Sequence, residues 1–358
     1  MRLVKRPIPS LARTVTFCDR KDMKRKLHLP CLGAPIFSRA TRGLPPPLLP
    51  VDWTKGGKLS FPIDGNDQYG DCEYAGACHG SNTFTGCVGQ ECSFDPAAII
   101  SSYLRLSGGD NGLDTDTMMM EWMNGLCGTP RRIFARAAVD PTNAAAMVAA
   151  IGYFGGVFLT MGVPDAWLEN VQPGMTWDAG PGVRADDNNG HAVWLNGATA
   201  VGYTLQTWGL SPPVTITPAG VAVCDPEVDV VASLDWFNAA GIAPNGYSYD
   251  QLASEWVSRG GQPWPPSPFP PTPIPPSPPP PIPPLPPGPT PWPSILQAIW
   301  QLLQLLGPLA VPIIDQWIEA SGMPPWLIAI VEAMISVILG ARDPHFRGFR
   351  FDRLERRR

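Results

Sequence analysis

A run of prolines near the C-terminal end constrains this chain more than any other feature. Between positions 263 and 293, 20 of 31 residues are proline, in a chain of 358 residues with 45 prolines in all. Neither a helix nor a sheet can absorb so many missing backbone N–H groups, so the run is predicted to be an extended polyproline II segment. At about 3.1 Å per residue it spans on the order of 95 Å. It therefore acts as a stiff spacer between a larger and a smaller part.

Charge is unevenly distributed along the chain. Residues 1–43 carry eleven Lys or Arg against two acidic residues, and residues 341–358 carry seven Arg against three, although the formal net charge is only −5. These ends are expected either to contact a partner, an anionic surface or the body of the protein, or to be solvated tails. We predict a basic N-terminal arm over 1–43, a globular domain over 44–260, the spacer over 261–293, an apolar helical module over 294–340 and an Arg-rich tail.

The module after the spacer contains two apolar stretches. The first, 295–314, includes three glutamines and is interrupted by Gly307-Pro308, and the second, 326–339, is 14 residues long and includes Glu332. A membrane-spanning helix needs about 20 predominantly apolar residues. We therefore expect residues 294–340 to form a helical hairpin that self-associates or contacts a membrane interface.

Two residues in the globular part have the surroundings of a catalytic thiol and its base. Cys72 follows Gly70-Asp71 and opens a run of small residues, which predicts a thiol at a helix N-terminus, where the helix dipole favours the thiolate. His191 precedes the apolar run 192–195, which predicts an imidazole at the start of a buried strand. Such pairs meet only in the folded chain. Each residue taken alone also fits an inert position in the core.

Other features of the same region bear on metal binding, helix packing and disulfide formation. The candidate ligands for a zinc ion are Cys72, Cys78, His79, Cys87 and Cys92. They include no Cys-x-x-Cys pair and are irregularly spaced, so we expect neither a metal nor a cofactor. Behind the predicted cap Asp114, a methionine-rich stretch at 118–123 is expected to be the core-facing stripe of a helix. Eight cysteines in 358 residues are too few for a disulfide scaffold.

Five landmarks fall in an order that resembles papain and the cathepsins. They are Leu44-Pro45 with Val51-Asp52-Trp53, the Gly-rich loop 107–113, the helix, turn and strand within 139–159, Gly190-His191-Ala192-Val193, and Gln206-Thr207-Trp208-Gly209. The resemblance implies an α+β papain-like fold, in which the nucleophile helix of a helical subdomain packs against an antiparallel β subdomain. The tail beyond Gly209 is similar to uncharacterised papain-like proteins of phages and bacteria.

The same resemblance assigns roles to five residues. Cys72 is the nucleophile, His191 is the base, Gln206 stands where the family has a His-orienting asparagine, and Asn66 or Gln68 supplies the oxyanion donor. The match is incomplete, because the family's Gly-Ser-Cys-Trp run is absent and Asp71-Cys72 is instead similar to peptidases that process bacteriocin leaders. Gln206 is also one methylene longer than asparagine, although its oxygen can accept from an imidazole N–H.

These observations predict a cysteine-dependent peptidase or amidase that acts on peptides or proteins. The alternative is a catalytically silent papain-like protein used in a virion or surface assembly and anchored through 294–340. No motif for sequence-specific nucleic-acid binding is present. The first 30 residues are basic and show no secretory signal, so a cytoplasmic or virion-associated setting is expected.

Overall fold

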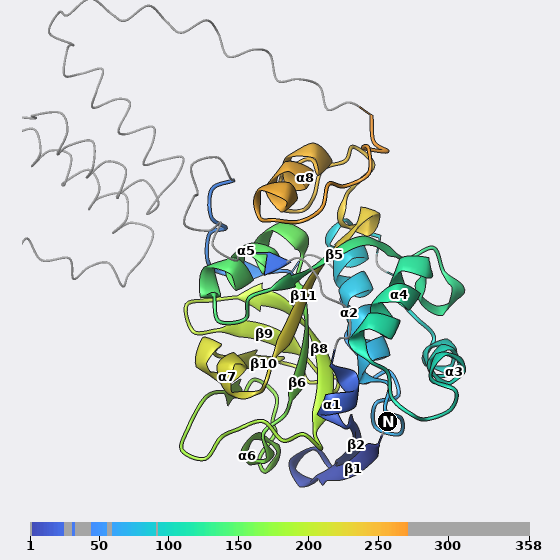
Figure 1. Cartoon of the computed structure of the whole chain (residues 1–358), viewed down its shortest axis with the longest axis vertical. Helices are drawn as coiled ribbons and strands as arrows, with labels where there is room; N and C mark the ends of the chain where they lie inside the picture. Colours follow the sequence, from blue (N-terminus) through green and yellow to red (C-terminus); the bar gives the residue numbers. More distant parts are fainter. Residues whose placement is uncertain (1, 25–30, 33–43, 56–58, 91, 271–358) are drawn as a thin grey trace, which may run out of the picture. The chain divides into compact units, whose positions relative to one another are not determined.

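The structure is a computed structural model that describes residues 2–24, 31–32, 44–55, 59–90 and 92–270 (Figure 1). The strands are β1 (Leu3–Ile8), β2 (Arg13–Cys18), β3 (Cys31–Leu32), β4 (Val51–Asp52), β5 (Ile133–Val139), β6 (Val157–Gly162), β7 (Thr176–Trp177), β8 (Gly190–Ala198), β9 (Tyr203–Gln206), β10 (Val214–Ile216) and β11 (Glu227–Ser233). The helices are α1 (Arg20–Met23), α2 (Cys72–Cys87), α3 (Pro96–Ser107), α4 (Thr115–Asn124), α5 (Ala144–Phe154), α6 (Asp165–Leu168), α7 (Pro218–Val223) and α8 (Tyr249–Ser258).

One mixed sheet runs through the body in the order β3-β5-β11-β6-β8-β9-β10-β7. Its central strands β5, β11, β6, β8, β9 and β10 pair antiparallel, and the two pairs at its ends are parallel. Figure 1 shows α2 lying beside β8, with α3 and α4 on the same side of the sheet. The predicted α+β architecture, with the helix that begins at Cys72 packed on an antiparallel sheet, is therefore confirmed.

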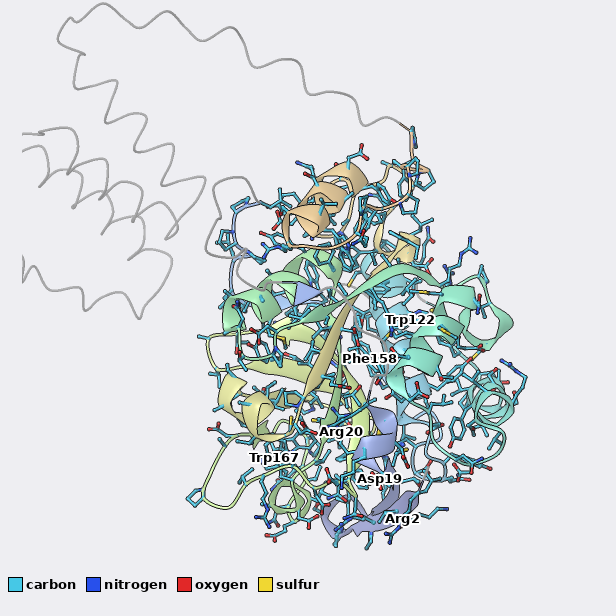
Figure 2. All side chains as sticks on the ribbon, viewed as in Figure 1. Arg2, Asp19, Arg20, Trp122, Phe158 and Trp167 are labelled. Carbon is cyan, nitrogen blue, oxygen red and sulfur yellow. The ribbon has the colours of Figure 1, made fainter. Side chains whose placement is uncertain are left out.

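Helix α2 lies close to the sheet because it carries glycine where another residue would clash. A methyl group on Gly76 would come within 2.9 Å of Phe158 on β6, and one on Gly80 within 2.5 Å of Trp122 on α4. Trp122 and Phe158 both lie in the interior (Figure 2). Helix α4 begins after Asp114, whose side chain accepts from the Thr117 N–H. The predicted cap and the core-facing helix of residues 118–123 are thus confirmed, although Met120 is exposed.

The N-terminal residues form a hairpin that is part of the body. β1 pairs antiparallel with β2, and Cys18 at the end of β2 pairs with Gly190 on β8. Arg20, just beyond the hairpin, is fully buried (Figure 2), and its guanidinium donates to the carbonyls of Asp225 at 2.8 Å and Thr160 at 3.4 Å. Residues 2–24 were expected to belong to a basic arm, but they are held in the core by Arg20 and apolar hairpin residues.

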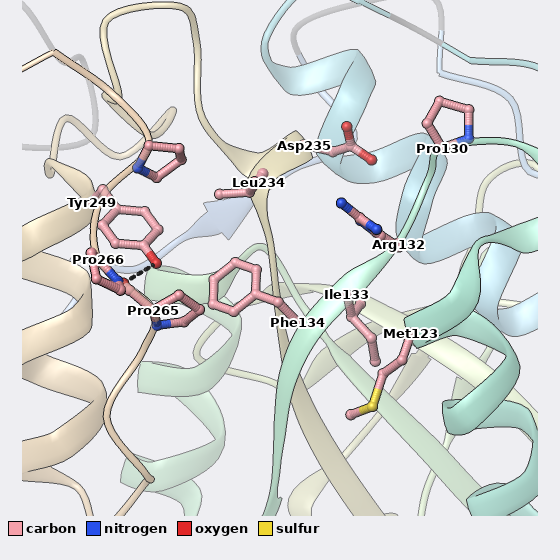
Figure 3. A pocket seen from close by; sticks show the side chains of 11 residues that line it. Met123, Pro130, Arg132, Ile133, Phe134, Leu234, Asp235, Tyr249, Pro265 and Pro266 are labelled. Atoms are coloured by element: carbon pink, nitrogen blue, oxygen red, sulfur yellow. Dashed lines mark hydrogen bonds between the residues drawn. The ribbon is translucent and has the colours of Figure 1, made fainter.

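The beginning of the proline-rich run also packs on the body. Trp264 and Phe269 contact the core, and the Tyr249 hydroxyl donates to the Pro265 carbonyl at 2.9 Å (Figure 3). The ring of Trp264 lies edge-on to Phe134 at 5.1 Å between centroids. This stretch forms one wall of an open pocket of about 570 Å³. Residues 2–24 and 261–270 therefore belong to the same folded unit as residues 44–260.

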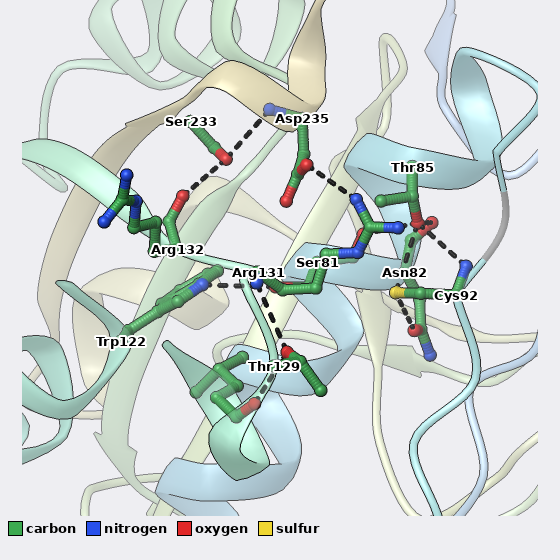
Figure 4. A network of polar contacts seen from close by, with 11 residues as sticks. Ser81, Asn82, Thr85, Cys92, Trp122, Thr129, Arg131, Arg132, Ser233 and Asp235 are labelled. Carbon is green, nitrogen blue, oxygen red and sulfur yellow. Dashed lines mark hydrogen bonds and ion pairs between the residues drawn. The ribbon is translucent and has the colours of Figure 1, made fainter. Parts of the chain in front are cut away.

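Polar contacts join neighbouring segments on the side of the sheet that carries α2 and α4. Arg131 pairs with Asp235 at 2.8 Å, and the Ser233 hydroxyl donates to the Arg132 carbonyl at 2.7 Å (Figure 4). The Trp122 indole N–H donates to the Ser81 hydroxyl of α2 at 3.1 Å. The last bond connects α4 to α2, and the first two connect the segment before β5 to β11 and to the residues that follow it.

The remaining sequence predictions fall on other parts of the chain. The rest of the spacer to residue 293, the apolar module over 294–340 and the Arg-rich tail over 341–358 lie outside the described residues. Within the described ranges, no helix combines the length and the apolar character that a membrane crossing requires.

Candidate active site

Cys72 is the first residue of α2, as the small residues after it predicted. The preceding Asp71 makes no side-chain capping bond to the first turn of the helix. The backbone N–H of Ala192 lies near the Cys72 sulfur and acts to lower the pKa of its thiol. Since Ala192 directly follows His191, this contact brings the thiol to the strand that carries the imidazole.

His191 is the second residue of β8 and pairs with Met161 on β6. Its Nε2 atom lies 2.8 Å from the Thr207 hydroxyl. The Trp208 ring stacks on the imidazole with centroids 4.9 Å apart, and Phe17 meets it edge-on at 5.9 Å. Its Nδ1 atom has no hydrogen-bond partner among the described residues. One ring nitrogen is therefore held, and the other is free for proton transfer.

Cys72 and His191 face the same small cavity between α2, β8 and the segment after β9. The cavity has a volume of about 10 Å³, roughly the least that holds one water molecule. Asn66, Gln206 and Thr207 also line it. Four of the five predicted site residues thus come together in the fold, and the fifth, Gln68, is exposed and does not line the cavity.

The side chain of Gln206 is directed away from the predicted partner. Its amide N–H donates to the Asn196 side-chain oxygen at 3.0 Å, and the hydroxyl of the next residue, Thr207, contacts His191 instead. Thr207 follows the last residue of β9. The bond predicted from Gln206 to His191 is therefore made by Thr207, since adjacent residues of an extended segment point in opposite directions.

Asn66 is held from three sides. Its amide nitrogen donates to the carbonyls of Thr16 at 3.2 Å and Tyr69 at 3.3 Å, and its oxygen accepts from the Trp208 indole N–H at 3.1 Å. Trp208 therefore bridges Asn66 and His191. The amide that was predicted to bind an oxyanion lies in the site, and it already binds a carbonyl oxygen of the N-terminal hairpin.

The N-terminal hairpin closes the site. Thr16 contacts Asn66, Phe17 covers both His191 and Trp208, and Cys18 lies at the end of β2 next to Gly70. Cys72 is 1% exposed and His191 is 3% exposed. Both side chains are therefore covered in this structure, in part by the hairpin.

Burial favours the uncharged forms of both Cys72 and His191. The neighbouring Cys18 thiol and burial raise the pKa of the Cys72 thiol well above its ordinary value. Burial, followed by the charge of His79, lowers the pKa of His191 to about 3. In the closed structure the pair is thus a thiol and a neutral imidazole, not the thiolate–imidazolium form.

A second histidine lies in the same cavity wall. His79 is seven residues beyond Cys72 on α2, its Nε2 atom lies 2.9 Å from the Pro62 carbonyl and it lies 3.3 Å from the Asp64 carboxylate. The sequence analysis considered this residue only as part of a zinc cluster. Within the described part of the chain, no three His, Cys, Asp or Glu side chains gather as a metal site requires.

Sequence reasoning missed Thr207 and the covering residues Thr16, Phe17 and Cys18. The hairpin had a signal, because Val15 and Phe17 alternate with polar residues as in a strand with one buried face. The high content of Lys and Arg over 1–43 led instead to the prediction of a basic arm. For Thr207, no local signal separated it from Gln206, since both carry a group that can bond to an imidazole.

The chain is similar in structure to several cysteine proteases. Neither a family model nor a curated protein matches it. Among solved structures, xylellain, a cysteine protease from Xylella fastidiosa, has 12% identity and a TM-score of 0.43 and is matched over 60% of this chain and 93% of its own. The Carica candamarcensis protease CMS1MS2 has 16% identity and a TM-score of 0.40, over 53% and 99%.

A third solved structure, the digestive procathepsin L 3 of Tenebrio molitor larvae, has 13% identity and a TM-score of 0.40, over 63% of this chain and 78% of its own. The chain resembles papain-like cysteine proteases.

Proposed function

We propose that this protein is a cysteine-dependent hydrolase of peptide or amide bonds, with Cys72 as nucleophile and His191 as base. The observation that carries the proposal is the convergence of the two residues on one cavity, with the Ala192 N–H at the sulfur and the His191 Nδ1 atom unpartnered among the described residues. A thiol at a helix N-terminus beside an imidazole is the arrangement that activates a cysteine.

The reaction would proceed through a thioester. His191 Nδ1 takes the proton of the Cys72 thiol, and the sulfur attacks the substrate carbonyl carbon. The oxyanion that develops accepts hydrogen bonds from the Asn66 amide and the Cys72 backbone N–H. The imidazolium then protonates the departing amine. Water, deprotonated by the same imidazole, releases the acid and restores the thiol.

Thr207 is assigned the positioning role that the sequence gave to Gln206. With its Nε2 proton donated to the Thr207 hydroxyl at 2.8 Å, His191 has the tautomer that leaves Nδ1 able to accept a proton. Trp208 stacks on the ring and excludes water from this hydrogen bond. Gln206 contributes more remotely, through Asn196.

Turnover requires the hairpin to leave the site. The Thr16 carbonyl occupies the Asn66 amide that the oxyanion would use, and the cavity of about 10 Å³ cannot admit a peptide. Once the hairpin moves, water and substrate reach the site and the Cys18 thiol moves away from Cys72. Both changes lower the pKa of Cys72, and hydration raises that of His191.

The closed site also favours a second candidate function, that of a catalytically silent structural or assembly protein. The specific observation is the burial of both reacting groups in their neutral forms. The two functions differ in one respect: the hydrolase opens its site under native conditions, and the silent protein does not.

Labelling by an epoxide-type thiol inhibitor, followed by mass mapping of the modified residue, separates the two. We expect Cys72 to be labelled in the native full-length chain, faster in Phe17→Ala, which uncovers His191, and far more slowly in His191→Asn. Cys78, buried six residues along the same helix, is the internal control and stays unlabelled. The proposal fails if Cys72 is labelled in denaturant only, in the parent and in Phe17→Ala alike.

A further inference from the structure

Cys18 is positioned beside Cys72 by contacts with Gly190 and Gly70. It pairs with Gly190, the residue before His191, and its thiol donates to the Gly70 carbonyl at 3.5 Å, two residues before Cys72. A methyl group placed on Gly70 would lie 3.3 Å from the Cys18 sulfur. Both cysteines are buried. The hairpin thus holds one thiol over the first turn of α2.

The two thiols are also direct neighbours. The Cys18 side chain lies within hydrogen-bond reach of the Cys72 thiol. A disulfide needs Cβ atoms about 3.8 Å apart, which side chains already in hydrogen-bond contact approach with small rotations. The chain between the two cysteines is long, and cross-links that close long loops constrain the unfolded chain most.

We propose that Cys18 and Cys72 form an oxidisable dithiol, and that its disulfide fastens the N-terminal hairpin over the site. The oxidant is hydrogen peroxide or a peroxide of similar size. One thiolate attacks a peroxide oxygen and becomes a sulfenic acid as water leaves. The other thiol attacks that sulfur and expels a second water. Two thiols and one peroxide thus give one disulfide and two waters, and a dithiol reductant reverses the bond.

The consequence for catalysis rests on the proposed function, but the disulfide itself does not. Oxidation would consume the nucleophile and at the same time prevent the hairpin from opening. Reduction would restore both. Because the thiols are buried, the rate of oxidation follows hairpin opening and is slow in the closed state.

A second thiol pair in the protein supplies the matched control. Cys127 lies within hydrogen-bond reach of Cys78, and this contact is the main reason that the pKa of Cys127 is lowered. Cys127 is also only half-buried, so this pair meets the oxidant sooner. Cys127→Ser therefore removes the competing pair and leaves Cys18 and Cys72 unchanged.

The test is peptide mapping without reduction after treatment of the full-length chain with hydrogen peroxide. We expect a cross-linked peptide that contains Cys18 and Cys72 in the parent and in Cys127→Ser, and its loss in Cys18→Ser and in Cys72→Ser. We also expect a higher Tm for the oxidised Cys127→Ser protein, which dithiothreitol reverses. Absence of the cross-linked peptide from both the parent and Cys127→Ser overturns the proposal.

The mapping measures mass and requires no activity, so its outcome is independent of the proposed hydrolase. If the cross-link forms but the epoxide never labels Cys72, the hydrolase fails and the dithiol stands. If the epoxide labels Cys72 and no cross-link forms, the dithiol fails and the hydrolase stands. Equal accumulation of higher oxides on Cys72 in the parent and in Cys18→Ser also counts against the dithiol, because a resolving thiol should suppress them.

Discussion

Two segments from opposite ends of the described chain cover the body in different ways. The hairpin β1–β2 leaves a cavity of about 10 Å³ over Cys72, whereas the stretch from Trp264 to Phe269 leaves an open pocket of about 570 Å³. The hairpin is held by strand pairing and by the fully buried Arg20. The C-terminal stretch is held by aromatic rings and the Tyr249 hydroxyl (Figure 3).

The difference follows from what each backbone can donate. Non-proline residues in the hairpin offer N–H groups, so the Thr16 N–H donates to the Asn66 carbonyl at 3.0 Å while the Thr16 carbonyl accepts from the Asn66 amide. Prolines offer only carbonyls and ring faces, and Pro265 accordingly accepts from Tyr249. The hairpin is thus held by backbone groups that both donate and accept hydrogen bonds. The proline stretch is held by carbonyls that accept and by ring contacts.

The first prediction is that catalysis depends on the residues around the cavity at Cys72 and not on those around the open pocket. Cys72→Ala should lower kcat/KM by about a thousandfold or more, because nucleophile loss is nearly total, and Thr207→Val should lower it less, by about ten- to a hundredfold. Gln206→Ala should cost less than Thr207→Val. Tyr249→Phe, in the wall of the open pocket, should leave kcat unchanged. Hydrolysis of a mixed fluorogenic peptide set measures all four, and equal residual rates for Cys72→Ala and Gln206→Ala would contradict these roles.

The second prediction concerns the anchor of the hairpin. Arg20→Leu removes the donor to the Asp225 and Thr160 carbonyls and should lower the free energy of unfolding by about 3 kcal/mol. It should also speed epoxide labelling of Cys72 at temperatures well below Tm, because the hairpin opens more often. Lys21→Leu is the control, since this exposed neighbour makes a surface ion pair with Asp187. Slower labelling in Arg20→Leu would contradict the role of the hairpin as a cover.

The third prediction concerns the C-terminal boundary of the folded unit. A chain ending at residue 270 keeps Trp264 and Phe269 and should match the full-length chain in denaturant midpoint. A chain ending at residue 262 loses both rings and should be less stable by about 2 to 4 kcal/mol. The two truncations differ by eight residues, so urea melts compare them directly. If both have the same midpoint, the proline stretch contributes nothing to the body.

The fourth prediction concerns acid sensitivity. His191 stays neutral in the folded chain, with a pKa of about 3 against 6.5 in the unfolded chain. Between these values the unfolded chain binds the extra proton, so the stability contributed by this group is intact above pH 6.5 and falls toward pH 3, by about 1 kcal/mol per pH unit. His191→Asn should flatten this part of the pH dependence of the urea midpoint. Parallel profiles for parent and variant would show that the ring is not buried as described.

Sequence reasoning worked where a short run of residues fixes its own surroundings. Cys72 opens a helix because small residues follow it, and His191 lies at the start of a strand because an apolar run follows it. Sequence reasoning failed where two adjacent side chains could both serve as the hydrogen-bond partner of His191. Gln206 and Thr207 are adjacent and both can bond to an imidazole, and only the fold shows that Thr207 is the one beside His191.

The hairpin was missed for a different reason. Its strand is antiparallel to β8, about 170 residues away in sequence, and its place in the core depends on Arg20, a residue that composition assigns to the surface. Nothing in the local sequence predicts that a buried arginine will donate to the carbonyls of Asp225 and Thr160. The outer limits of the folded unit were therefore placed too far inward by sequence alone.

The covered cavity has a consequence for how rates should be compared across variants. Under the proposed function, substrate and epoxide inhibitor both require the same conformational opening, so each apparent second-order rate constant equals the intrinsic one multiplied by the fraction of molecules that are open. A change in the hairpin alters that fraction only. The ratio of kcat/KM to the inhibitor's rate constant should then stay constant from one hairpin variant to the next, even where each value changes a hundredfold.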